Sequence, residues 1–124
     1  MARRARREDG FTLIELLTVM VIVGVLVGIA YPTYLGYKER ANQATAEANL
    51  RQAIPAIEAF YNEFQTYDTA VMTMSAIKSF DQGLSPDFAI VSGTPTSYCV
   101  SATHGGSTYY KDGPGAQIGT APCT

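Results

Sequence analysis

Glu15 is the most unusual of the side chains that could do chemistry in this sequence. It is the one charged residue in FTLIELLTVMVIVGVLVGIAYPTYLGY, which runs from Phe11 to Tyr37. An ionised carboxylate near the centre of a membrane helix costs about 2.5–3.5 kcal/mol, and less towards an end. Glu15 lies four residues into the apolar run, so the cost is partial. The carboxylate still needs a partner, and the run contains no basic residue.

The two cysteines, Cys99 and Cys123, form the next candidate group. Neither belongs to a CxxC motif or has a histidine at metal-ligand spacing, so a redox motif or a zinc site is not expected. A disulfide between them would stabilise a small domain by roughly 3 kcal/mol in the chain-entropy model. It would also require an oxidising compartment, which places this part of the chain outside the cytoplasm. The alternative is a pair of buried, unpaired thiols.

The remaining polar groups give no enzyme signature. His104 is the only histidine and lies beside two glycines, so we expect a solvated loop residue rather than a ligand or a base. Asp112-Gly113 could help to hold calcium, but a single carboxylate favours a plain turn. The sequence has no nucleophile–base arrangement, no phosphate-binding glycine loop and no paired carboxylates. We therefore expect no catalytic activity, no metal and no cofactor.

Charge is strongly segregated along the 124 residues, which suffice for one domain at most. The formal net charge is −2, and four arginines stand within the first seven positions: Arg3, Arg4, Arg6 and Arg7. Removal of residues 1–10 takes away these four arginines, one glutamate and one aspartate, and leaves a formal charge of −4. Bulk nucleic-acid binding is therefore not expected.

Residues 1–10 are too polar to form a packed element, whereas residues 11–37 would make a helix about 40 Å long, enough to span a bilayer core of about 30 Å. The arginines ahead of this helix predict a cytoplasmic N-terminus and place everything after Lys38 on the far side. Three tyrosines near the end of the run fit an aromatic belt at the membrane interface better than a conduction path: Tyr31, Tyr34 and Tyr37.

Residues 38–124 are expected to form a small head that begins with a continuation of the helix. Apolar side chains recur at helical spacing and predict one buried stripe: Leu50, Ile54, Ile57, Tyr61 and Phe64. A single helix would then run from Phe11 to about Asn62.

Several residues weaken this long helix. Pro32 and Pro55 each remove a backbone donor and favour a kink. Gly24, Gly28 and Gly36 lower helix propensity further. Because membrane helices tolerate such residues, we interpret these positions as curvature rather than as breaks.

After Phe64 the sequence predicts a short helix within Ala70–Phe80, starting near Tyr67-Asp68-Thr69. Short strands between turn residues are expected at Phe88–Ser92, Ser97–Ala102 and Ser107–Lys111. Three or four antiparallel strands laid on the helical stripe would make an α+β domain with a C-terminal disulfide loop.

Cleavage after Gly10 would create an amine at Phe11 that could pair with Glu15 of the same chain or of a neighbour. With this arrangement the segment resembles the type IV filament family, which comprises type IV pilins and the pseudopilins of type II secretion and DNA-uptake systems. Gly10 matches the residue before the prepilin-peptidase cut, Phe11 the N-methylated first residue, Glu15 the fifth-position acid and Pro32 the proline near the end of the membrane segment. The resemblance is close over about Met1 to Arg40 and architectural beyond.

The resemblance implies a membrane precursor that is cut and methylated by a prepilin peptidase and then lifted by assembly machinery into a homo-oligomeric helical filament at the cell surface. Glu15 would contact a neighbouring subunit's N-terminal amine. Family filaments can lose helicity between the positions that match Gly24 and Pro32. The resemblance implies a pilin serving adhesion, motility or DNA uptake, and the Cys99–Cys123 loop favours it over a pseudopilin, several of which lack the loop or use calcium there.

Two alternatives involve no filament. The first is a surface binding domain that keeps residues 16–37 as an ordinary membrane anchor. The second is a secretory signal peptide, because Gly28-Ile29-Ala30 offers small residues for cleavage before Tyr31. The second alternative leaves Glu15 unexplained.

Overall fold

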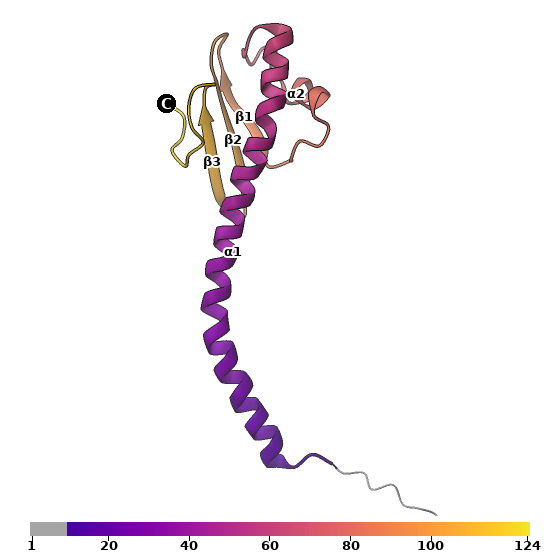
Figure 1. Ribbon diagram of the computed structural model, residues 1–124, viewed down its shortest axis with the longest axis vertical. Coiled ribbons are helices and arrows are strands. Elements are labelled where there is room, and N and C mark those ends of the chain that lie inside the picture. The colour runs from indigo at the N-terminus through magenta and orange to yellow at the C-terminus, as the bar shows by residue number, and fades with distance from the viewer. Residues whose placement is uncertain (1–9) are drawn as a thin grey trace, which may run out of the picture. The chain divides into compact units, whose positions relative to one another are not determined.

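The structure is a computed structural model that describes residues 10–124 (Figure 1). The elements along the chain are helix α1 (Leu13–Phe64), helix α2 (Met74–Phe80) and strands β1 (Phe88–Gly93), β2 (Tyr98–His104) and β3 (Ser107–Asp112). The α+β class expected from the sequence is confirmed. The chain divides into two compact units, Met1–Gly36 and Tyr37–Thr124, and each is described by itself. The expected basic leader lies outside the described residues, except for Gly10.

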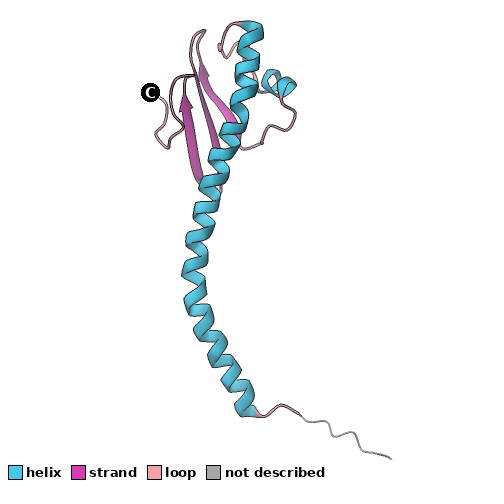
Figure 2. Cartoon of the chain, in the orientation of Figure 1, coloured by secondary structure: helices cyan, strands magenta, loops and turns pink. Residues whose placement is uncertain are grey.

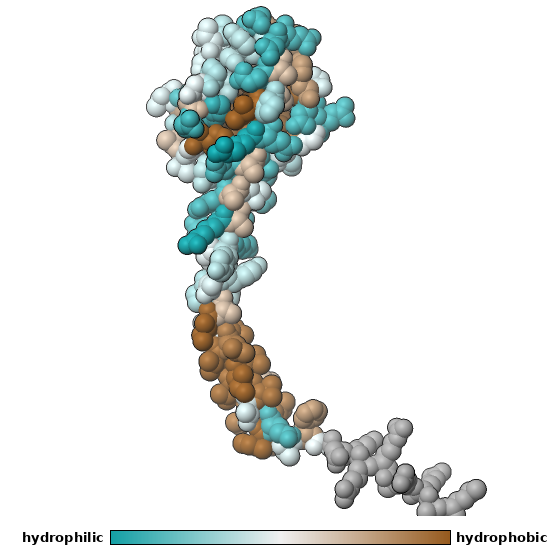
Figure 3. All heavy atoms as spheres, viewed as in Figure 1, coloured by the Kyte–Doolittle hydropathy of each residue, from teal (hydrophilic) through white to brown (hydrophobic). Residues whose placement is uncertain are grey.

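In the first unit, α1 is apolar on every side and covered by nothing. The exposed fractions of Leu13, Leu16 and Val25 are 82%, 59% and 59%, and brown, hydrophobic spheres cover most of the face of this stretch that Figure 3 shows. By length and composition the helix could cross a membrane. A helix that is hydrophobic all round is stable only when lipid or other protein surrounds it. This part of the chain therefore requires one of these two environments.

The weak positions do not interrupt α1. The helix runs unbroken through Gly24, Gly28, Pro32 and Pro55. A proline inside a helix removes one hydrogen bond, and the flanking turns can carry the helix past it. These residues are therefore accommodated within one helix that is 52 residues long.

In the second unit, α1 buries one face against the sheet. Its buried residues are Ala46, Leu50, Ala53, Ala56, Ile57 and Phe60. The expected stripe was partly wrong, because Phe64 is 47% exposed while Phe60 is fully buried. The buried face shares Leu50 and Ile57 with the expected stripe but also includes Phe60, which the stripe omitted. Three alanines also lie on the buried face: Ala46, Ala53 and Ala56.

The three strands form one antiparallel sheet in the order β1-β2-β3 (Figure 2). Phe88 pairs with Ala102 and Cys99 with Asp112, and a bulge interrupts β1 between Ile90 and Ser92. The central strand β2 is buried along most of its length and joins the core through Tyr98, Val100 and Ala102. All three expected strands are present, with ends shifted by one or two residues.

Two local expectations need correction. Helix α2 begins at Met74 rather than near Asp68, because Thr73 is its N-cap and accepts a hydrogen bond from the Ala76 N–H. Asp68 instead accepts from the Ala70 N–H at 2.9 Å and closes a turn. His104 is the last residue of β2 rather than part of a loop. Gly105 and Gly106 make the turn that follows, with positive φ angles of 55° and 86°.

Candidate functional site

Thr12 and Glu15 form a reciprocal cap at the start of α1. The Thr12 N–H donates to Glu15 Oε2 at 2.9 Å, and the Glu15 N–H donates to Thr12 Oγ1 at 3.3 Å. This is a capping box, in which each side chain accepts a bond from the other residue's otherwise unpaired amide. Glu15 therefore has a partner within its own chain, and within residues 10–124 it forms no ion pair with a basic residue. This pair was not predicted, and the sequence signal that indicates it is the Thr-x-x-Glu spacing of Thr12 and Glu15.

Gly10 and Phe11 precede this cap. Both residues are exposed and lie outside the helix, and the exposed fraction of Phe11 is 93%. A peptide bond in an exposed, non-helical segment is accessible to a peptidase. Glu15 also lies in the first turn of α1, where the helix dipole favours a negative charge. The capping box thus sets a sharp boundary between the accessible bond and the helix.

Gly24 and Gly28 stand free on α1 in the first unit. A Cβ atom added at either position would meet nothing within 4 Å outside its own stretch of helix. Neither residue has a positive φ angle. The single chain therefore has no packing or backbone need for glycine at either position.

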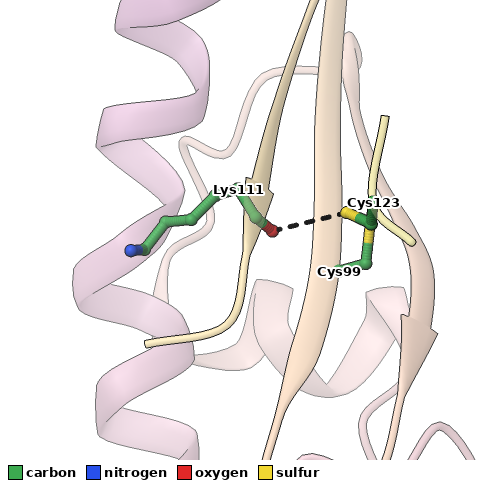
Figure 4. The surroundings of a disulfide bond; sticks show 3 residues. All are labelled: Cys99, Lys111 and Cys123. Carbon is green, nitrogen blue, oxygen red and sulfur yellow. Dashed lines mark hydrogen bonds between the residues drawn. A yellow bond between two sulfur atoms is a disulfide. The ribbon is translucent and has the colours of Figure 1, made fainter. Parts of the chain in front are cut away.

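The C-terminal segment is held by the disulfide between Cys99 of β2 and Cys123 (Figure 4). The two Cα atoms are 6.1 Å apart, and Cys99 is buried. The expected pairing is thus confirmed. The sulfur of Cys123 lies 3.8 Å from the Lys111 carbonyl oxygen, the contact dashed in the figure. A disulfide sulfur carries no proton, so we interpret this as a packing contact.

Lys111 is a second anchor for the same segment, and no sequence pattern predicted it. Its side chain is 94% buried, since the exposed fraction is 6%. The ammonium donates to the carbonyl oxygens of Pro114 at 3.3 Å and Ala116 at 2.6 Å. Carbonyl partners reduce the cost of burying a charge. Lys111 and the disulfide together hold the loop that follows β3.

His104 takes part in a small polar cluster at the end of the sheet. Its Nδ1 lies 2.7 Å from Asp87 Oδ2, and the same oxygen accepts a hydrogen bond from Asn49 Nδ2 at 3.1 Å. The Asp87 backbone carbonyl accepts from the Thr103 N–H at 3.1 Å. Asp87 therefore ties α1 to β2. The interpretation of His104 as a solvated loop residue was wrong, because strand register brings it to Asp87.

Three tyrosines pack together beside Glu58. The ring centroids of Tyr61 and Tyr67 are 4.3 Å apart, and those of Tyr67 and Tyr98 are 4.8 Å apart. The Tyr98 hydroxyl is buried and has no hydrogen-bond partner. Burial, and secondarily the negative charge of Glu58, raise the pKa values of both Tyr67 and Tyr98 above the usual range.

Asp112 ends β3, and Gly113 follows with a positive φ of 83°, which fits the expected turn. Across residues 10–124 no group of three or more histidine, cysteine, aspartate or glutamate side chains is arranged to hold a metal ion.

An apolar helix exposed on every side, a capped start with Gly10-Phe11 outside it, and a three-stranded head closed by a disulfide define a pilin-like α+β fold. Residues 5–31 match the family described as the prokaryotic N-terminal methylation motif. The type IV wide pilus major component PilA4 of Thermus thermophilus is 35% identical over 107 residues, which cover 85% of this chain and 80% of that protein.

Two further relatives match over shorter stretches. The type IV major pilin protein PilA of Myxococcus xanthus is 39% identical over 61 residues, or 49% of this chain and 28% of the relative. The type II secretion system core protein G of Aeromonas hydrophila is 32% identical over 72 residues, or 58% of this chain and 50% of the relative. With the long match to a pilus component, the chain belongs to the type IV pilin family.

Proposed function

We propose that this chain is the structural subunit of a type IV pilus at the cell surface, and that it polymerises through its apolar helix. The observation that carries the proposal is the fully exposed, uncharged stretch of α1 that follows Glu15. Neighbouring copies would bury that surface in the filament, and lipid would bury it before assembly. Adhesion, motility and DNA uptake are the roles that such a pilus could serve.

Processing would begin with hydrolysis of the peptide bond between Gly10 and Phe11. Water adds across this bond, so that Gly10 becomes the carboxyl end of the leader and Phe11 gains a free amine. A methyl donor then replaces one N–H of that amine by N–CH₃. The methylated amine keeps its positive charge and can approach a Glu15 carboxylate of a neighbouring copy. The prepilin peptidase would act on a precursor whose arginine-rich N-terminus faces the cytoplasm.

A second candidate is a pseudopilin of a type II secretion system. It is favoured by the similarity to type II secretion core protein G from several bacteria, at 30–32% identity. The longer match to the pilus component and the Cys99–Cys123 disulfide support the pilus instead. A membrane-anchored binding domain would use Glu15 only as a helix cap and would leave the exposed Gly10-Phe11 bond without a role.

The proposal is tested on filaments sheared from cells that express the full chain. We expect micrometre filaments of this chain, and an intact mass that corresponds to a start at Phe11 with one added methyl group. A Gly10→Val variant, with a branched side chain beside the cut, is the matched control and should keep Met1 or remain in the membrane.

Other results would exclude the proposal. A start at Tyr31 would indicate a secreted protein, and an intact Met1 in the wild type would indicate a plain anchor. A processed chain that makes no surface filament would favour the pseudopilin.

A further inference from the structure

Four charged residues of alternating sign follow one side of α1 in the second unit: Arg40, Glu47, Arg51 and Glu58. They are separated by seven, four and seven residues. At about 100° per residue, these spacings place all four Cα–Cβ directions within roughly 40° of one another. The exposed fractions of the Arg51 and Glu47 side chains are 66% and 35%, Arg40 is exposed and Glu58 is half-exposed. We call these four residues the charge stripe.

Only the middle of the charge stripe forms an ion pair within one chain, because Glu58 lies beside Tyr67 and Tyr98 and pairs with no cation among the described residues. Arg51 Nη2 lies 2.6 Å from Glu47 Oε1. Among residues 10–124 the one other ion pair joins His104 and Asp87, so neither Arg40 nor Glu58 has an oppositely charged group within 4.0 Å in the described part of the chain. The stripe therefore leaves a positive charge at one end and a negative charge at the other.

We propose that the charge stripe docks against the same stripe of a second copy that runs parallel and is displaced by seven residues along the helix, about 10.5 Å. In this register Arg40 of one copy lies beside Glu47 of the next, and Arg51 lies beside Glu58 of the next. Both charges that lack an oppositely charged partner in the single chain then gain one. The inference rests on the proposed filament, and it names the contact that sets the axial step between copies.

Other parallel registers are worse. With no displacement, every charge meets a like charge. A displacement of eleven residues places Arg40 beside Arg51 and Glu47 beside Glu58, which is again repulsive. A displacement of four residues forms one pair and leaves the other charges unmatched. The seven-residue step is thus the only short displacement that forms two attractive pairs.

An antiparallel pairing would also match the charges, because Arg40 would meet Glu58 and Glu47 would meet Arg51. The proposed function excludes it, since copies inserted in one membrane share one orientation. In a filament whose exposed α1 faces turn towards a common axis, each copy presents the same stripe to the copies above and below it. Exposed small residues beside the stripe would let the backbones approach: Ala44, Ala48 and Pro55.

Cysteine pairs at the four stripe positions test the register in full-length chains assembled on cells. R40C/E47C and R51C/E58C should give ladders of linked dimers and larger species on non-reducing gels of sheared filaments. The same four positions paired as R40C/R51C and E47C/E58C should give none, which makes them the matched controls. Two cysteines seven residues apart on one helix cannot join within a chain, because their Cα atoms exceed the bridging limit of about 7 Å.

If the double-cysteine variants do not assemble, inversion of the charges in the stripe tests the same contact. In the half-inverted R40E/R51E chain all four residues of the charge stripe are negative. We expect its filament yield to fall by about tenfold or more, because each contact between stripes turns from attractive to repulsive. The R40E/E47R/R51E/E58R chain should regain filaments, since every pair is restored with opposite sign. Expressed together, wild-type and fully inverted chains should form separate filaments.

The outcomes separate this inference from the proposed function. Ladders from the eleven-residue pairs or from R40C/E58C, normal filaments from the half-inverted chain, or mixed filaments would overturn the charge-stripe contact while wild-type filaments keep the pilin assignment. If the wild-type chain makes no filament, the proposed function fails first and the inference fails with it.

Discussion

Glu15 shows how a charge within an apolar segment can be satisfied by a backbone N–H group. No basic side chain in the part of the chain that the structure describes pairs with Glu15, whereas the Thr12 N–H donates to it at 2.9 Å. A carboxylate has two oxygens and can accept several hydrogen bonds, and only Oε2 is used by the cap. The capping box can therefore persist while the free oxygen accepts the amine of a neighbouring copy. We infer that Thr12 orients Glu15 for that contact.

Replacement of Thr12 tests the cap directly. Thr12→Ala removes the oxygen that accepts from the Glu15 N–H, and loss of such an N-cap costs about 1 kcal/mol. We expect the Glu15 amide to exchange about fivefold faster with solvent in detergent-solubilised chain, measured by hydrogen exchange. Thr12→Ser keeps the oxygen and should preserve protection. Equal protection in the alanine variant would show that the cap does not form.

Tyr98 is a second single residue whose environment controls a measurable property. Its hydroxyl is buried without a hydrogen-bond partner, and burial raises its pKa. An unsatisfied buried hydroxyl costs free energy, whereas an apolar group of the same shape does not. In the sequence it is only one tyrosine among eight. Its burial depends on contacts with Tyr67 and with α1 that no local pattern encodes.

Tyr98→Phe should change how the free energy of unfolding decreases at alkaline pH. Above about pH 10 the unfolded phenol loses its proton, while the folded phenol, with its raised pKa, retains it. The contribution of this phenol to the free energy of unfolding is therefore fully present below that pH and is lost as the pH rises above it. We expect the variant to lose stability less steeply, and to match or exceed wild type by up to about 1 kcal/mol at pH 7. Tyrosine near-UV circular dichroism during urea unfolding measures both, and an unchanged alkaline slope would contradict the assignment.

The elements divide into those that local sequence determines and those that packing determines. The strands were located correctly because turns rich in Gly and Pro, together with Asp112, bracket these short runs. Helix α2 was placed too early because Asp68 and Thr73 are both good caps, and only the fold decides that Asp68 closes a turn. The cluster around Asp87 was not predicted because it joins residues from different elements, which meet only through strand register. The partners of Lys111 lie three and five residues further along the chain and depend on the conformation of the loop after β3.

The disulfide is the element-level contact with the largest expected effect. The C99A/C123S chain should lose about 3 kcal/mol of unfolding free energy, because the bridge closes a loop with a sequence separation of 24 residues. Urea unfolding of detergent-solubilised chain, followed by tyrosine circular dichroism, measures the loss. Wild type treated with a reductant is the control and should show the same shift. Equal midpoints with and without the bridge would mean that Lys111 alone holds the C-terminal loop.

The two units of the chain differ in what they can do alone. The second unit has its own buried cluster, which includes Leu50, Ile57 and Phe60, and a covalent bridge. Residues 10–36 of the first unit bury nothing and expose a continuous apolar surface. An element that is apolar on all sides is stable only inside lipid or among other helices. We infer that the sequence of this unit is suited to contacts with lipid and with neighbouring copies, because its described residues make no packing contacts within one chain.

Gly24 and Gly28 follow the same logic. The single chain leaves open space for a side chain at both positions, and glycine weakens a helix by up to about 1 kcal/mol relative to alanine. We infer that the weakness serves the assembled state, in which residues 24–32 can unwind. The G24A/G28A chain should remain folded in detergent, with amide exchange across residues 24–32 about fivefold slower or more, and its filament yield should fall.

Gly36→Ala makes the same change at another open position of α1, outside the segment expected to unwind, and should leave the yield unchanged. Filament yield from sheared cells and amide exchange of the filaments together separate the possibilities. Filaments of G24A/G28A at wild-type yield, with residues 24–32 protected from exchange in both proteins, would mean that α1 stays helical in the filament. The glycines would then serve close packing between copies, and their replacement should instead widen the spacing of the apolar helices.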